Sequence, residues 1–323
     1  MELRILNLAG LAVCAVIFGA CEKDIDVDLP DAPEQFVVEG TIEPGLPPFV
    51  ILTRTQGWFE PLSPTSLAGI FVGGATVTVD NGDGPIALDQ VCTGSLTPEQ
   101  LVLVSELTGL DPALLHAVDL CVYASANTAL FGEAGRTYTL RVQVEGHELS
   151  ASTTIPHPVP LDSVWFKLAQ VRPDDDSLGF AWCRLTDPDT TGNNYRWMAR
   201  RISHRSDGSA EDPFYISPFG TTFDDRFING LSVDLNTVRG RAPFSNKPED
   251  ENEEAGFFKT GDTIAVKFLS IGRSEYEFYK SYEENVSSSG DIFSTPVNAR
   301  GNIHGGLGIW AGLGVYADTI YCE

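Results

Sequence analysis

Alternation of apolar and polar residues is the dominant pattern along this chain. Between Tyr138 and Val144, apolar side chains alternate with Thr139, Arg141 and Gln143, so a strand here buries one face and exposes the other. Similar short runs, separated by residues typical of turns, predict further strands near residues 36–40, 49–53, 75–79, 162–168, 178–185, 194–202 and 262–271. The apolar, glycine-rich segment 305–315 is too short for a membrane-spanning helix and predicts a closing strand.

Two segments instead show helical spacing. Thr97 and Pro98 precede apolar residues at positions 101, 104 and 107, and Asp111-Pro112 begins a second helical pattern. We therefore predict a helical insertion over residues 97–120, either decorative or involved in binding. Further along, Ser274 is a candidate N-cap for a helix whose Tyr276, Tyr279 and Tyr282 share one face, a pattern typical of core packing.

Many short strands in a chain of 323 residues predict an all-β fold with two domains. Three prolines at positions 156, 158 and 160 exclude a central strand there and mark the boundary. We predict two β-sandwich domains of immunoglobulin or fibronectin-like type. The first covers residues 34–157 and contains the helical insertion, and the second covers residues 158–323 and contains one helix near its C-terminus.

The N-terminus carries a compartment signal. One cation, Arg4, precedes an apolar run that ends with Gly19-Ala20 directly before Cys21. We predict a lipoprotein signal peptide over residues 1–20, lipidation of Cys21, and an acidic, proline-punctuated tether over residues 21–33. A plain secretory signal and a buried N-terminal helix are the alternative interpretations.

The net charge of the chain limits the classes of partner that it can bind. Asp and Glu number 45 against 21 Lys and Arg, which gives a net charge of −24. Such a surface repels a phosphate backbone, so nucleic acid is excluded as a partner. The spacing of the glycines near the C-terminus matches no dinucleotide fingerprint and no phosphate loop, and we predict no cofactor.

The cysteines are consistent with an oxidising compartment. Removal of the leader and lipidation of Cys21 leave Cys92, Cys121, Cys183 and Cys322, which allow three pairings. The pairing local in sequence joins Cys92 to Cys121 and Cys183 to Cys322, one bridge in each predicted domain. Four unpaired buried thiols are the alternative. The chain has no CxxC, so a zinc or thioredoxin-like site lacks support.

Candidate chemistry is sparse. The five histidines are scattered without an HExxH motif, and no GxSxG motif is present, so we predict no catalytic residues. Asp187, Asp189 and Asn193 place oxygen atoms at alternating positions around a turn, faintly like a calcium loop. Because the closing glutamate of a true EF-hand loop is absent, a turn rich in Asp and Asn is the favoured interpretation.

Several motifs occur in an order that is similar to a family of Bacteroidetes outer-membrane lipoproteins of unknown function, the domain-of-unknown-function family 4249. The likeness extends from about Pro33 to the C-terminus, although the helical insertion departs from the simplest form of the family. His304, Gly305 and Gly306 lie in the last motif, where we expect His304 to make a structural hydrogen bond. The motifs are residues 37–40, 47–55, 135–140, 154–156, 160–163, 261–263 and 302–309.

This resemblance implies a cell-envelope protein located beside TonB-dependent outer-membrane receptors, and it supplies no catalytic residues. The leading hypothesis is a lipid-anchored, non-catalytic accessory of such a receptor, at the cell surface or the periplasmic face of the outer membrane. A structural or adhesive envelope lipoprotein is the first alternative. A surface hydrolase built from carboxylates that are distant in sequence is the second.

Overall fold

The computed structural model describes residues 33–56, 69–108, 115, 120–170, 177–206, 208, 210–241, 247–288 and 299–323. The predicted leader, Cys21 and the tether up to residue 32 lie outside these residues. So does most of the second helix predicted within the insertion, of which only the buried Leu115 is described. Within the described part of the chain, no helix is long and apolar enough to cross a membrane.

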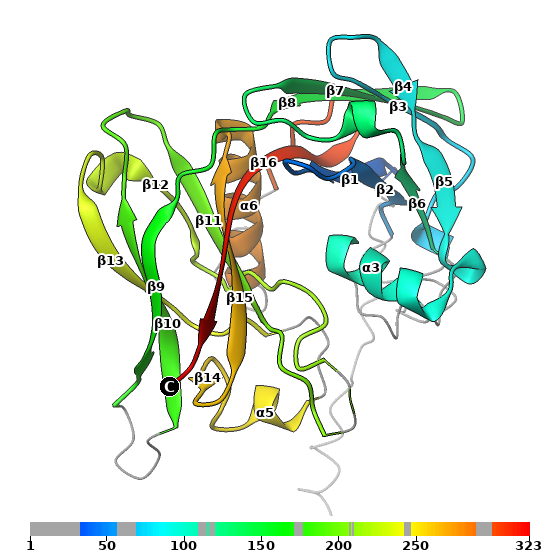
Figure 1. The fold of residues 1–323 in the computed structure, drawn as a ribbon. Coiled ribbons are helices and arrows are strands. Elements are labelled where there is room, and N and C mark those ends of the chain that lie inside the picture. The colour runs from blue at the N-terminus through cyan, green and yellow to red at the C-terminus, as the bar shows by residue number, and fades with distance from the viewer. Residues whose placement is uncertain are drawn as a thin grey trace, which may run out of the picture. The chain divides into compact units, whose positions relative to one another are not determined.

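An eight-stranded mixed sheet is the main structural element (Figure 1). Its strands follow the order β12-β11-β15-β16-β1-β2-β6-β5, in which neighbours are hydrogen-bonded. The strands are β1 (Phe36–Ile42), β2 (Phe49–Arg54), β5 (Asp89–Cys92), β6 (Cys121–Ala124), β11 (Asn194–Arg201), β12 (Thr222–Asp224), β15 (Thr263–Ile271) and β16 (Leu307–Tyr321).

Two four-stranded sheets complete the β structure. One has the order β4-β3-β7-β8, with β3 (Thr76–Asp80), β4 (Pro85–Ala87), β7 (Thr137–Val144) and β8 (His147–Thr154). The other has the order β13-β10-β14, and β9 also pairs with β10; its strands are β9 (Leu161–Leu168), β10 (Leu178–Thr186), β13 (Ser232–Thr237) and β14 (Phe258–Lys259). The predicted all-β class is confirmed.

Each four-stranded sheet covers a different part of the eight-stranded sheet, and this produces two main cores. The first core extends from Val38 to Ile155 along the chain and also includes Trp310. The second contains residues between Leu161 and Cys322. The cores therefore change near the proline-rich segment 156–160, where the domain boundary is predicted.

The strand β16 requires a correction to the picture of two separate sandwiches, because one sheet continues across the predicted boundary. Its residues Leu307–Gly312 pair in parallel with β1, and its residues Leu313–Tyr321 pair antiparallel with β15. Figure 1 shows β16 running from one part of the sheet to the other. Trp310 is fully buried in the first core, and its Nε1 donates to the carbonyl oxygen of Tyr138 at 2.9 Å. A strand from the end of the sequence thus completes the N-terminal core.

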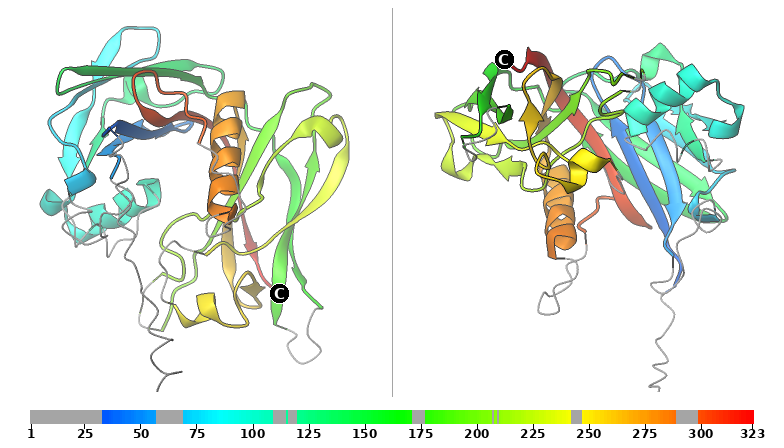
Figure 2. Two further views of the ribbon diagram at one scale, coloured as in Figure 1. Left: turned by 180° about the vertical axis from the view of Figure 1, so that it is seen from behind. Right: turned by 90° about the horizontal axis from the view of Figure 1, so that it is seen from below.

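The predicted helices near residue 98 and near the C-terminus are confirmed as α3 (Pro98–Thr108) and α6 (Arg273–Ser288). Thr97 and Gln100 form the reciprocal hydrogen bonds of an N-terminal cap on α3. The helix α6 lies against the eight-stranded sheet (Figure 2). Its Tyr276 packs there with Leu269 and Ile309. A short helix, α5 (Pro248–Glu251), occupies part of the acidic segment before β14.

The cysteines follow the prediction in one pair and depart from it in the other. Cys92 and Cys121 are opposite each other on β5 and β6 and form a disulfide. Cys183 and Cys322 carry free thiols in the second core, so their predicted disulfide is absent from the structure. Burial raises the pKa of each of these two thiols to about 12, and both act as small apolar groups in the core.

Candidate functional site

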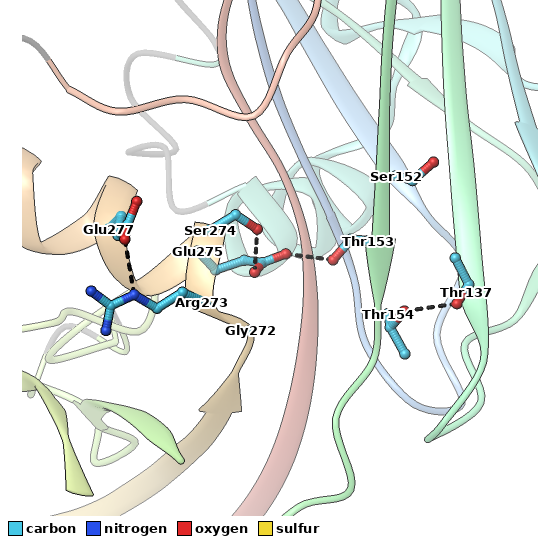
Figure 3. A pocket seen from close by; sticks show the side chains of 9 residues that line it. All are labelled: Thr137, Ser152, Thr153, Thr154, Gly272, Arg273, Ser274, Glu275 and Glu277. Atoms are coloured by element: carbon cyan, nitrogen blue, oxygen red, sulfur yellow. Dashed lines mark hydrogen bonds and ion pairs between the residues drawn. The ribbon is translucent and has the colours of Figure 1, made fainter. Parts of the chain in front are cut away.

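Three adjoining cavities surround the start of α6, and Arg273 lines all of them. We refer to them together as the Arg273 site. The first has a volume of about 540 Å³ and lies between β7, β8 and the first turn of α6 (Figure 3). The second, of about 450 Å³, lies beside β12. The third, of about 610 Å³, is lined by the proline-rich segment 156–160 and the loop between β10 and β11.

The junction between β15 and α6 positions this site. Gly272 separates the two elements, and a Cβ atom on it would lie 2.4 Å from Oε2 of Glu275. The missing side chain therefore allows the Glu275 carboxylate to fold back over the helix start, where its Oε2 accepts a hydrogen bond from Ser274 Oγ at 2.9 Å. Its Oε1 accepts a hydrogen bond from Thr153 Oγ1 of β8 at 2.5 Å, and both contacts are visible in Figure 3.

Thr153 extends this connection to β16. Its Oγ1 accepts a hydrogen bond from the backbone N–H of Gly312 at 2.8 Å while it donates to Glu275. Both Thr153 and Glu275 are almost fully buried, with 4% and 2% of their surface exposed. The helix α6, the strand β8 and the strand β16 are thus joined through one buried hydroxyl, which fixes one wall of the Arg273 site.

The Arg273 side chain itself is 65% exposed. Its Nε donates to Oε1 of Glu277 at 2.9 Å, and its guanidinium lies 5.0 Å from the centre of the Tyr276 ring. A second contact, 3.9 Å from Nη1 to Oδ2 of Asp224, connects it to the second cavity. This arrangement presents hydrogen-bond donors of a permanently charged group to solvent at the meeting point of the cavities.

Asp224 pairs with a second exposed arginine. Arg226 Nε donates to Oδ1 of Asp224 at 2.9 Å, and the Arg226 side chain is 69% exposed. Burial opposes ionisation of Asp224, but the hydrogen bond and the charge of Arg226 outweigh it, so the pKa of Asp224 is lower than usual. Asp224 is therefore a carboxylate at neutral pH.

Asp225, next in sequence, anchors the loop between β10 and β11. Its Oδ2 accepts hydrogen bonds from the backbone N–H groups of Gly192 and Asn193 at 2.7 and 2.9 Å. Asp225 is 3% exposed, and its own backbone N–H donates to the carbonyl oxygen of Asn193 at 3.0 Å. The loop and the turn after β12 are therefore held together by a buried carboxylate.

The residues that resemble a calcium loop in sequence also make hydrogen bonds within the fold. Asp187 accepts from the Tyr195 hydroxyl at 2.5 Å and from the backbone N–H of Gly230 at 3.2 Å. Asn193 donates from Nδ2 to the Thr190 carbonyl oxygen at 2.5 Å, and Asp189 is exposed. In the described part of the chain, no three His, Cys, Asp or Glu side chains are arranged to hold a metal ion. These contacts are those of the favoured interpretation, a turn rich in Asp and Asn.

The motif around His304 lies against the edge of β8, and its residues do not line the three cavities. The backbone of His304 exchanges two hydrogen bonds with Ser150, at 2.8 and 3.1 Å, and its imidazole is exposed. A Cβ on Gly305 would lie 2.5 Å from the Glu148 carbonyl oxygen, and one on Gly306 would lie 2.2 Å from Leu149 Cδ2. The motif is therefore a close-packed junction, in which the structural hydrogen bonds of His304 come from its backbone.

Several residues of the Arg273 site are absent from the sequence-based candidates, including Thr153, Arg273 and Asn229. The local signals are the strand-to-helix junction at Gly272 and Ser274 and the turn rich in Asp and Asn, whose Asn193 lines the third cavity. The remaining side chains come from separate segments of the chain. Hydroxyl, amide, carboxylate and guanidinium groups line the cavities. Such groups suit the binding of a polar ligand through hydrogen bonds.

Comparison with known proteins gives one match. The family model described as "Domain of unknown function (DUF4249)" matches residues 22–318, which includes every cavity of the Arg273 site. No curated protein and no solved structure matches the chain. Because the match covers most of the sequence, the chain belongs to the DUF4249 family.

Proposed function

We propose that this chain is a lipid-anchored outer-membrane protein that binds a ligand without transforming it, as an accessory of a TonB-dependent uptake receptor. The Arg273 site supports the binding part of this proposal, because three adjoining cavities meet there at one exposed arginine. The pattern that ends at Cys21 supports the lipid anchor. The receptor partner follows from the family resemblance.

The chemistry of the site supports binding. Its buried carboxylates are engaged by neighbouring groups: Glu275 by Thr153 and Ser274, and Asp225 by backbone amides. Carboxylates held in this way form rigid walls, which lowers the entropic cost of binding a ligand.

The anchor is tested by replacing the lipidation residue. In Cys21→Ala we expect the protein to leave the membrane fraction, because no acyl chain is then attached. A variant that stays with the membrane contradicts the lipid anchor.

The accessory role is tested by affinity purification of the tagged protein from gently solubilised outer membranes, with partners identified by mass spectrometry. We expect recovery of a TonB-dependent receptor in stoichiometric amount. Recovery of the protein alone, from cells that express the receptor, contradicts the accessory role and favours a structural or adhesive one.

The Arg273 site is tested through uptake. Arg273→Ala is expected to reduce uptake of the receptor's substrate, whereas Arg184→Ala, which removes a comparably exposed arginine from β10, is expected to leave it unchanged. Equal uptake in both variants contradicts a role for the site.

A further inference from the structure

Two residues that line the second cavity of the Arg273 site carry a side-chain amide oxygen that lacks a hydrogen bond within the described residues. Oδ1 of Asn194 and Oδ1 of Asn229 are both buried and without a partner within the described residues. Asn194 is 4% exposed, and its Nδ2 donates to the Gly192 carbonyl oxygen at 2.9 Å. That bond fixes the orientation of the Asn194 amide and leaves its oxygen as the unsatisfied atom. A buried acceptor without a donor is costly, so this cavity is suited to a ligand that supplies donors.

The fold brings these acceptors together from separate segments. Asn194 and Asp224 are directly opposite in the antiparallel pairing of β11 and β12, so their side chains project from the same face. Asn229 follows one turn later, where its backbone N–H donates to the Asp225 carbonyl oxygen at 2.9 Å. All four residues line the same cavity.

The charges that line this cavity cancel. Asp224 and Asp225 contribute two carboxylates, and Arg226 and Arg273 contribute two guanidinium groups. A calcium ion would have to compete with Arg226 for Asp224 and would lie close to both guanidinium groups. An uncharged ligand meets no such opposition, and hydroxyl groups both donate and accept hydrogen bonds.

We propose that this cavity binds a neutral saccharide. Its hydroxyl groups donate to the amide oxygens of Asn194 and Asn229 and accept from the guanidinium groups of Arg226 and Arg273. The inference rests on the proposed binding function, because it names the class of ligand.

The experiment uses the full-length processed protein in detergent, with asparagine side chains labelled with ¹⁵N. The probes are D-glucose, D-galactose, D-mannose, D-xylose and N-acetyl-D-glucosamine, titrated to tens of millimolar. We expect at least one sugar to shift the side-chain amide resonances of Asn194 and Asn229 in a saturable manner. Asn229→Ala and Arg226→Ala are each expected to weaken binding of that sugar about tenfold, the effect of losing one good hydrogen bond.

Asn236→Ala is the matched control, because Asn236 is exposed on β13 and does not line the cavity. It is expected to leave sugar binding unchanged. Arg226 is highly exposed, so Arg226→Ala remains informative if Asn229→Ala fails to fold.

The proposal is overturned if none of the sugars shifts the two resonances, or if both variants bind sugar as the unaltered protein does. Calcium chloride that shifts these resonances when the sugars do not would instead assign a cation site. If a receptor is recovered but no sugar shifts the resonances, only the saccharide proposal is overturned. If a sugar binds but no receptor is recovered, only the accessory role is contradicted.

Discussion

The hydroxyl of Thr153 donates to Glu275 across 122 positions of sequence and joins β8 to α6. Because the same oxygen accepts the backbone N–H of Gly312, one side chain satisfies a donor and an acceptor that are both buried. Removal of a side chain with two buried partners leaves both of them unsatisfied, which is more costly than the loss of an exposed hydrogen bond.

We therefore expect Thr153→Val to lower the free energy of unfolding by about 2–4 kcal/mol, since two buried groups lose their partner while the shape is kept. Urea denaturation measures the change. Thr154→Val is the control, because Thr154 is exposed and its hydroxyl contacts the Thr137 hydroxyl at 2.7 Å. Equal destabilisation by the two variants would contradict the bridging role of Thr153.

A buried ion pair predicts how stability depends on pH. Arg201 and Asp212 are 6% and 3% exposed, and Arg201 donates to both carboxylate oxygens of Asp212 at 3.0 Å. Burial opposes ionisation of Asp212, but the hydrogen bonds and charge of Arg201 outweigh it and lower its pKa. A lowered pKa in the folded state stabilises the protein above the unfolded-state value of about 3.9. This contribution is lost as the pH falls through the lower, folded-state pKa.

Asp212→Ala is expected to cost about 2–4 kcal/mol at pH 7, because the buried Arg201 guanidinium loses its bidentate partner and keeps only the longer ion pairs with Glu211 and Glu249, at 3.4 and 3.7 Å. Below about pH 4 the difference between the variant and the unaltered protein should shrink, since protonation of Asp212 removes the same contribution. Urea titrations across the acid range measure both effects. Asp234→Asn, at an exposed pair with Arg184, should change stability little, and a difference at Asp212 that does not vary with pH would refute the linkage.

The strands were largely predictable from the sequence, whereas their partners were not. Alternation between Tyr138 and Val144 predicted β7, and β7 buries that face. The segment 305–315 was correctly predicted as a strand, but nothing local indicates that Trp310 fills the N-terminal core or that β16 pairs with β1. Local pattern determines which face of a strand is buried, while pairing between distant strands depends on the packing of the whole chain.

The dependence on pairing between distant strands also explains why the candidate site could not be predicted from the sequence. Asn194, Asp224 and Asn229 are separated in sequence, and strand pairing alone brings the first two together. The cysteines illustrate a related limit: Cys92 and Cys121 flank the insertion and meet on paired strands, whereas Cys183 and Cys322 share a core without forming a bond. Spacing in sequence does not distinguish these two cases.

The disulfide provides a third prediction. The bond between Cys92 and Cys121 closes a segment with a sequence separation of 29. In the chain-entropy model, replacing both cysteines with Ser lowers the free energy of unfolding by about 3–4 kcal/mol, because the unfolded chain gains freedom. Urea unfolding of the double variant measures this change, and unaltered stability would contradict the model.

Peptide mapping checks the assignment of one disulfide and two free thiols. After denaturation without reductant, a thiol reagent should label Cys183 and Cys322, whereas the peptides that contain Cys92 and Cys121 should be recovered linked to each other. In the folded protein Cys183 and Cys322 should react slowly, because both are buried and protonated at neutral pH. Recovery of a linked Cys183–Cys322 peptide would show that the predicted second disulfide forms, contrary to the free thiols of the structure.

The pairing of β16 with β1 predicts an unusually sensitive glycine. Gly308 is opposite Val38 in the parallel register and has a φ of 105°, and a Cβ there would lie 1.9 Å from the Val38 carbonyl oxygen. Gly308→Ala therefore combines backbone strain with a clash that only separation of the two strands can relieve. We expect it to cost about 3–5 kcal/mol, more than the strain alone.

Gly84→Ala is the matched control, because Gly84 has a similar φ of 115° and nothing lies within 4 Å of its Cβ position. It should cost only about 1–2 kcal/mol. Urea denaturation of both variants separates the two contributions, and an equal loss of stability would show that β16 and β1 do not pack as closely as described.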